Sequence, residues 1–249
     1  MSSFGVGRVS SLFVYPMSFD EFLTATGQEG LLRTKRNSSS TNPLPEAFYN
    51  RLVEAFRSYM LVGGMPEAVA IYTETGSYRY SSDIVNEIIQ GYQDDFAKYG
   101  AKANPLLLRQ TLISVAHQAG AKFVYSRVEG QYRSAEVKVA LEMLKDAGLI
   151  IPTYHTDANG VPLGAEINER VVKYLIHDTG VLLGILGIDD DIDDSIKEMM
   201  VADSINLVDK GHVAEMMAGL ELIKYSSPQK RHQLYYWQNM NKGTCAEVD

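Results

Sequence analysis

The chain has 249 residues, of which 45% are hydrophobic and 22% are charged. This length and composition suit one large or several small globular domains, and they exclude collagen-like, mucin-like and wholly disordered proteins. Acidic residues outnumber basic ones by 31 to 23, which gives a formal net charge of −8. A nucleic-acid-binding surface that covers the whole chain is therefore not expected.

The charge is unevenly distributed along the chain. Residues 101–151 hold seven Lys or Arg against four acidic residues, whereas residues 186–221 hold ten acidic residues against two lysines. This pattern predicts a mildly basic module followed by a strongly acidic one. The run Asp189–Asp194 lacks the spaced oxygens, turn glycine and distal glutamate of a Ca²⁺ loop, so it is interpreted as a solvated linker.

Cys245 is the single cysteine, so the chain can form neither an internal disulfide nor a thiolate metal cluster, and a reducing, cytoplasmic location is predicted. Neither a secretory leader nor a membrane-spanning run of about 18 apolar residues is found, so no membrane partner is expected. The five histidines are widely spaced, and no phosphate-binding loop motif occurs. No cofactor is expected to bind this chain alone.

The first residues predict one strand and one helix. Arg8–Tyr15 is apolar and aromatic and is followed by Pro16, which cannot donate a ladder hydrogen bond, so a strand is predicted there. Ser18 followed by Glu21 has the spacing of a capping box and predicts a short helix over 18–23. Asn37–Pro43 is polar and rich in turn-forming residues, which indicates a linker.

Apolar residues then recur at helical spacing in four segments. The predicted helices are 48–60, ended by Gly63, Gly64 and Pro66; 82–99; 105–119; and 134–147, ended by Gly148.

Strand patterns follow the last of these helices. Leu149–His155 and Glu166–Ile176 flank the turn sequence at 157–160, which predicts a hairpin. Gln233–Trp237 and Cys245–Asp249 are two further strand candidates. The predicted class is mainly α with small β elements (α+β), and two helices followed by a two-stranded wing have the order of a winged helix-turn-helix.

The second helix of such a domain is the one that could enter a DNA major groove. Two interpretations are open for this domain. It could pack between domains or bind protein partners, or it could contact DNA through a few cations. The outer face of the helix has mixed charge, with Glu136, Lys138, Glu142, Lys145 and Asp146; the cations available for DNA are Arg127, Arg133, Lys138 and Lys145.

Several sequence strings together resemble a known family. They are VYPMSFDEFL at 14–23, YMLVGGMPE at 59–67, YQDDFAKY at 92–99, DAGLI at 146–150 and AEVD at 246–249. With these strings the chain resembles the prokaryotic AAA-type ATPases that carry a C-terminal domain of unknown function. The resemblance extends over nearly the whole chain.

The resemblance implies that this sequence is the C-terminal portion of such an ATPase, with the P-loop domain as a missing N-terminal partner. ATP and Mg²⁺ are implied as cofactors of the complete family protein, and ATP hydrolysis as its activity; the chain alone is not expected to be an enzyme. The implied division is a remnant of the P-loop sheet (1–23), a loop or linker (24–44), a helical lid (45–100), a winged helix (101–187) and a truncated restriction-endonuclease-like domain (188–249).

The resemblance also suggests three site residues. Arg8 lies where the family often has a basic residue near the nucleotide, so it is a candidate nucleotide sensor or else a surface cation. Glu215 and Asp249 match the helix and strand carboxylates that hold Mg²⁺ in nucleases of the similar fold. However, the Glu-x-Lys strand is absent, and Met216 replaces a common Asn. Glu215 could instead be a solvated helix residue beside a core face of Val213, Met217 and Leu220.

Three functions are compatible with these observations. The first is a coupling and interaction region of an AAA-type ATPase. The alternative is a stand-alone winged-helix DNA-binding regulator. A third and weaker interpretation is a residual Mg²⁺-dependent nuclease. Unpaired apolar strands at the two ends would also favour association into a homo-oligomer.

Overall fold

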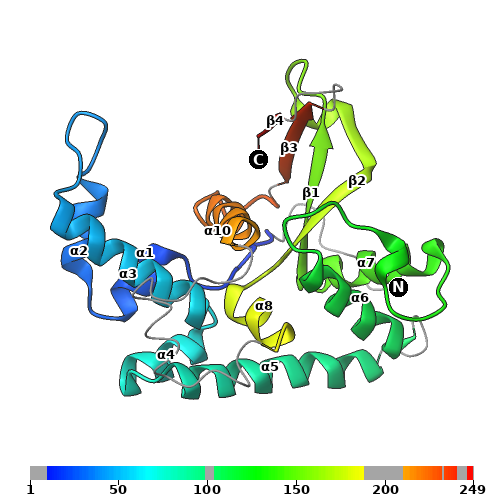
Figure 1. The fold of residues 1–249 in the computed structure, drawn as a ribbon, viewed down its shortest axis with the longest axis horizontal. Coiled ribbons are helices and arrows are strands. Elements are labelled where there is room, and N and C mark those ends of the chain that lie inside the picture. The colour runs from blue at the N-terminus through cyan, green and yellow to red at the C-terminus, as the bar shows by residue number, and fades with distance from the viewer. Residues whose placement is uncertain (1–9, 99–103, 188–209, 232, 240–245, 249) are drawn as a thin grey trace.

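The computed structural model describes residues 10–98, 104–187, 210–231, 233–239 and 246–248. Helices predominate, and a small sheet completes the fold, so the α+β class is confirmed (Figure 1). The helices are α1 (Phe19–Ala25), α2 (Glu29–Arg36), α3 (Glu46–Val62), α4 (Pro66–Thr75), α5 (Tyr78–Lys98), α6 (Pro105–His117), α7 (Ser134–Asp146), α8 (Thr179–Ile185) and α10 (Lys210–Lys224). The strands are β1 (Ile150–Thr156), β2 (Ile167–Ile176), β3 (Leu234–Asn239) and β4 (Ala246–Val248).

The N-terminal helices form where the predicted caps lie. Ser18 and Glu21 make the expected capping box at the start of α1. The four longer helices predicted from apolar spacing are all present. α3 ends at Gly63, which has a φ of 78°, and α7 is followed by Gly148, also with a φ of 78°. Both glycines adopt a left-handed backbone that stops the helix.

Two predictions for the N-terminal part are wrong. The described residues of the predicted strand, Ser10–Tyr15, form no strand, because no neighbouring strand pairs with them; the Phe13 amide instead donates to the Pro228 carbonyl at 2.9 Å. The stretch 24–44, predicted as loop or linker, contains the helix α2. The polar segment after α2 does form a tight turn, with a bridge between Ser39 and Asn42.

The sheet has the strand order β2-β1-β3-β4. β1 and β2 form the predicted antiparallel hairpin, in which Ile150 lies opposite Ile176. β3 pairs with β1 in parallel, with Thr153 opposite Leu234, and β4 pairs with β3 antiparallel. The terminal segment therefore adds strands to the hairpin, and the sheet crosses the predicted domain boundary at 187/188.

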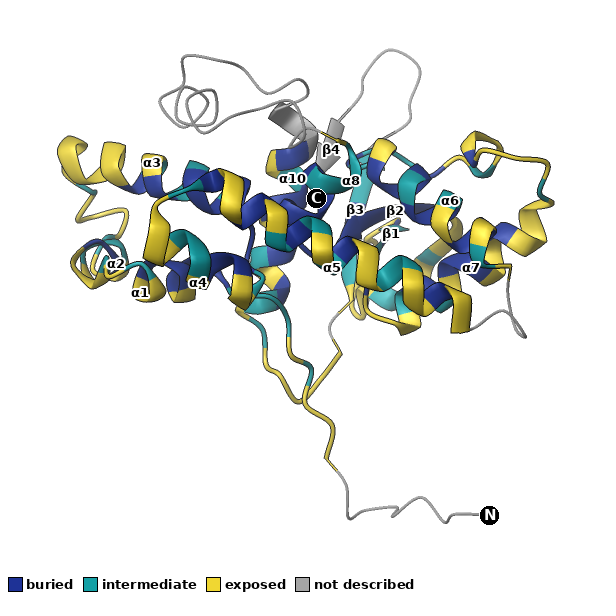
Figure 2. Cartoon of the chain, turned by 90° about the horizontal axis from the view of Figure 1, so that it is seen from below, coloured by how far each residue is buried: buried dark blue, intermediate teal, exposed yellow. Residues whose placement is uncertain are grey.

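Two hydrophobic clusters fill the interior. Figure 2 marks the buried residues of the helices and strands in dark blue. One joins α5, α6 and α7 to the hairpin, and the other joins α1, α2, α3 and α4. α8 and α10 contribute to both: Leu182 and Met216 belong to the first, and Leu183 and Met217 to the second. α8 and α10 lie between the N-terminal helices and the hairpin (Figure 1). These two helices therefore connect the two halves of the molecule.

Candidate functional site

Two of the sequence strings described above meet in the fold. The Met17 amide, just before α1, donates to the Gly64 carbonyl at 2.7 Å, after the end of α3. The Tyr59 hydroxyl lies 2.6 Å from the Met17 carbonyl. A Cβ atom on Gly64 would lie 2.3 Å from that carbonyl oxygen, so only glycine allows this approach. The segment before α1 is thus held directly against the end of α3.

The helix α10 reaches the same point from far along the chain. Glu221 accepts hydrogen bonds from the Phe19 amide at 3.0 Å and from the Tyr59 hydroxyl at 2.7 Å. The Lys224 ammonium donates to the Met17 carbonyl at 3.1 Å and to the Tyr59 hydroxyl at 2.7 Å. We call Met17, Phe19, Tyr59, Glu221 and Lys224 the junction. It joins α1, α3 and α10 by polar contacts.

Burial sets the electrostatics of the junction. The Lys224 side chain is 4% exposed, and this burial lowers the pKa of its ammonium, although nearby Asp178 and Glu221 act in the opposite direction. Burial, followed by the charge of Glu221, raises the pKa of the Tyr59 hydroxyl well above its usual range. Tyr59 is therefore neutral at any physiological pH and serves as a hydrogen-bonding group.

Asp178 extends the junction to α8. Asp178 is fully buried, with 0% of its surface exposed. One of its carboxyl oxygens accepts a hydrogen bond from the Gly64 amide at 2.6 Å. The other accepts from the Val181 amide at 3.2 Å and so caps α8. The neighbouring His177 contacts the Tyr92 hydroxyl and the Leu149 carbonyl, each at 3.1 Å, and burial lowers its imidazole pKa.

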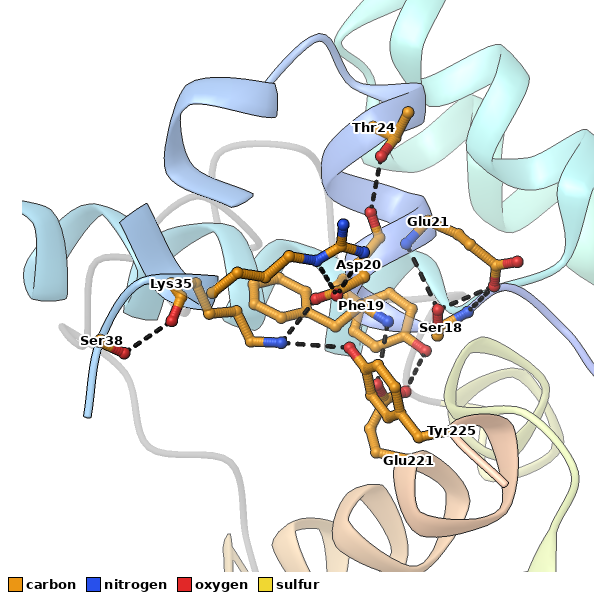
Figure 3. A network of polar contacts seen from close by, with 11 residues as sticks. Ser18, Phe19, Asp20, Glu21, Thr24, Lys35, Ser38, Glu221 and Tyr225 are labelled. Carbon is orange, nitrogen blue, oxygen red and sulfur yellow. Dashed lines mark hydrogen bonds and ion pairs between the residues drawn. The ribbon is translucent and has the colours of Figure 1, made fainter. Parts of the chain in front are cut away.

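An outer ion-pair group lies beside the junction, as Figure 3 shows. Asp20 accepts from Lys35 at 2.6 Å and from Arg36 at 3.0 Å, while Lys35 also donates to the Tyr225 hydroxyl at 3.1 Å. Burial would raise the pKa of Asp20, but hydrogen bonds from Lys35, Tyr225 and Arg36 outweigh it and lower that pKa. This group ties α1 and α2 to the end of α10.

A family model described as a domain of unknown function, DUF8612, matches residues 53–192. The chain belongs to this family. No curated protein and no solved structure matches the chain.

The matched range divides the junction. Of the junction residues, Tyr59 lies within the DUF8612 region, as do Gly64 and Asp178, which contact or extend the junction. Met17, Phe19, Glu221 and Lys224 lie outside it. At the junction, therefore, residues that precede and residues that follow the family region are bonded to that region.

The predicted DNA-contacting residues lie on the surface of the DUF8612 region and do not converge on one pocket. Arg127, Arg133 and Lys138 are exposed. Lys145 is paired with Glu142, and this contact raises the pKa of its ammonium against the opposing effect of burial. Lys138 shares the outer face of α7 with exposed carboxylates, so its positive charge is locally balanced. DNA contact by these residues stays a prediction.

The remaining predicted site residues have separate outcomes. Arg8 and Asp249 lie outside the described residues, as does the acidic run 189–194. Glu215 is on α10, beside the predicted core residues Val213, Met217 and Leu220, which are buried. Its carboxylate is not free in solvent but pairs with Lys173. Within the described ranges, no group of three His, Cys, Asp or Glu side chains could hold a metal ion.

The extended segment before the junction borders a cavity of about 560 Å³. Phe13, Tyr15, His177 and Arg231 contribute to its walls, together with the start of β1. On the same segment, Leu12 is 63% exposed and Val14 is 90% exposed. Leu12 and Val14 also border the cavity, but most of each residue is exposed to solvent.

Sequence reasoning did not identify Asp178, Glu221 or Lys224. Asp178 had a detectable signal, since an Asp directly before a helix is a common N-cap. Glu221 and Lys224 had none, because charged residues three apart on a helix usually lie on its solvated face.

Within the described ranges, no helix is long and apolar enough to span a membrane.

Proposed function

We propose that this chain is the coupling region of an AAA-type ATPase, in which a P-loop domain precedes the extended segment 10–16. In this proposal residues 45–100 act as the lid, 101–187 as a winged helix used for packing, and 188–249 as an interaction element. The protein would act in the cytoplasm. Nucleotide chemistry takes place in the P-loop domain, where ATP and Mg²⁺ bind, and this region transmits the result.

The observation that carries the proposal is the attachment of α10 to the backbone of Met17 and Phe19. Segment 10–16 continues directly into these two residues. From there contacts lead through Tyr59 and Glu221 to α10, and through Gly64 and Asp178 to α8. Both helices pack on the hairpin, so a continuous path of contacts runs from the N-terminal segment to the sheet.

The exposed Leu12 and Val14 also support the proposal. Extended apolar backbone with an exposed face is a template for pairing with another strand. A neighbouring P-loop sheet would cover both side chains. Arg8, two residues before the described segment, would then lie close to that domain, where a cation could stabilise phosphoryl charge.

The alternative, a stand-alone winged-helix regulator bound to DNA, has weaker support. α7 presents exposed Glu136, Glu142 and Asp146 on the same helix as Lys138 and Lys145. Affinity for duplex DNA grows with the number of phosphates that cations neutralise, and this face offers few unbalanced cations. A protein partner or a second copy of the chain fits this mixed surface better.

The test is the native product of the source cell, detected with an antibody and mapped by peptides. We expect a product larger than 27.7 kDa that contains a phosphate-loop peptide upstream of Met1, and ATP turnover by that product but not by this chain alone. A native product of 27.7 kDa, or ATP turnover by the isolated chain, would contradict the proposal. The former result would favour the DNA-binding regulator.

A further inference from the structure

The Glu215 carboxylate on α10 is paired with a cation from the sheet. The Lys173 ammonium, on β2, lies 2.6 Å from the Glu215 Oε1 atom. The Lys173 side chain is 4% exposed, and that of Glu215 is 21% exposed. A lysine buried to this degree requires a partner for its charge. Glu215 supplies it from the facing helix.

The surroundings of Lys173 come from both sides of the 187/188 boundary. Thr153 of β1 lies opposite Lys173, and Leu234 of β3 lies opposite Thr153. The ammonium also lies 4.8 Å from the centre of the Tyr236 ring on β3, within the range of a cation–π contact. The Lys173 side chain therefore contacts α10 and β3 of the terminal segment while its backbone belongs to the hairpin.

This arrangement does not suit the Mg²⁺ that the nuclease-like resemblance implies at Glu215. Mg²⁺ binds about 2.0–2.1 Å from its oxygen ligands and prefers octahedral coordination. An ion at Glu215 would place two more positive charges beside a buried ammonium that already neutralises the carboxylate. Within the described ranges, no group of three His, Cys, Asp or Glu side chains could complete such a site.

We propose that Lys173, and not a metal ion, neutralises the Glu215 carboxylate. This ion pair, which we call the clasp, fastens the terminal segment to the hairpin. The pair joins α10 to β2, and the aromatic ring of Tyr236 joins β3 to the same ammonium. The role of Glu215 is then to position α10 on the sheet. This inference does not depend on the ATPase proposal, because it concerns contacts within this chain.

Two measurements on the full chain test the clasp. The first is thermal unfolding of Glu215→Gln, Lys173→Met and the double variant Lys173→Met/Glu215→Leu. Each single variant leaves one buried polar group without its charged partner, so we expect the Tm to fall by about 5–10 °C. The double variant replaces the pair by apolar groups, and we expect it to recover at least half of that loss. Lys138→Met and Glu87→Gln, both at exposed positions, serve as matched controls.

The second measurement is Mn²⁺ binding to the folded wild-type chain by electron paramagnetic resonance, with Mn²⁺ as the probe for a Mg²⁺ site. We expect either no binding or binding that Glu215→Gln leaves unchanged. Mn²⁺ binding that is lost in Glu215→Gln would overturn the proposal, as would single variants whose Tm equals that of the controls. Absence of Mn²⁺ binding by the wild type supports the proposal even if a variant fails to fold. If the wild type binds Mn²⁺ and Glu215→Gln does not fold, Glu215→Ala takes its place in the comparison.

Discussion

Replacing Asp178 by Ala is expected to lower the free energy of unfolding by about 3–5 kcal/mol. The side chain accepts hydrogen bonds from the Gly64 and Val181 amides within a fully buried site. Alanine would leave both amides without this partner and would remove the cap of α8. A buried donor left without a partner costs about 1–3 kcal/mol, and the loss of a helix N-cap costs about 1 kcal/mol.

Chemical denaturation of Asp178→Ala measures this loss. The control is Asp83→Ala, at an exposed position on α5, which is expected to change the free energy of unfolding by no more than about 0.5 kcal/mol. Asp178→Asn should fall between the two, because an amide oxygen can keep one of the two hydrogen bonds. If Asp178→Ala cost less than about 1 kcal/mol, Asp178 would not hold α8 to the end of α3.

Replacing Gly64 by Ala should destabilise the chain by about 2–4 kcal/mol, because the added methyl group has no free space. Its Cβ atom would lie 2.3 Å from the Met17 carbonyl oxygen and 2.9 Å from the Met17 nitrogen. Both are backbone atoms, so no side-chain rotation can relieve the overlap. The Met17 backbone must move away from α3, which breaks the hydrogen bond between the Met17 amide and the Gly64 carbonyl.

Gly91→Ala provides the matched control for this substitution. Gly91 lies within α5, and a Cβ atom there would meet nothing within 4 Å. Because alanine favours a helix over glycine, this variant should stabilise the chain by up to about 1 kcal/mol. Denaturant midpoints of the two variants should therefore shift in opposite directions. Equal shifts would contradict the close packing of Met17 on Gly64.

Local patterns in the sequence predicted much of the fold. The helices α3, α5, α6 and α7 have long periodic apolar faces, and glycines mark the ends of α3 and α7. The hairpin has two strand-like runs around a turn sequence. Such signals act over neighbouring residues, and this is why they could be recognised without knowledge of the tertiary structure.

The errors have different causes. The apolar run at 10–15 has strand propensity, but a strand also needs a partner, and the described structure provides none. α2 buries only Leu31 and Leu32 and so lacks a long periodic pattern. α4 begins at Pro66, which was interpreted only as the end of the preceding helix, although proline is also favoured at the first helical position.

The junction also lay beyond sequence reasoning, because its contacts join residues that are far apart along the chain. Lys224 and Met17 are 207 residues apart along the chain, and Asp178 and Gly64 are 114 apart. No periodicity or spacing links such residues. The strings at 14–23 and 59–67 both contribute to the family resemblance, but the resemblance does not indicate that they contact each other or that α10 contacts both.

Hydrogen exchange of the wild type and of Lys224→Met tests most directly whether α10 holds the N-terminal segment. The variant removes the ammonium that bonds to the Met17 carbonyl and the Tyr59 hydroxyl. We predict that amides in residues 17–23 and 59–64 exchange about tenfold faster or more, which corresponds to about 1.4 kcal/mol of lost local stability, while the hairpin residues 150–156 keep their rate. Lys138→Met should change none of these rates. Unchanged exchange at 17–23 in Lys224→Met would contradict the coupling of this segment to α10.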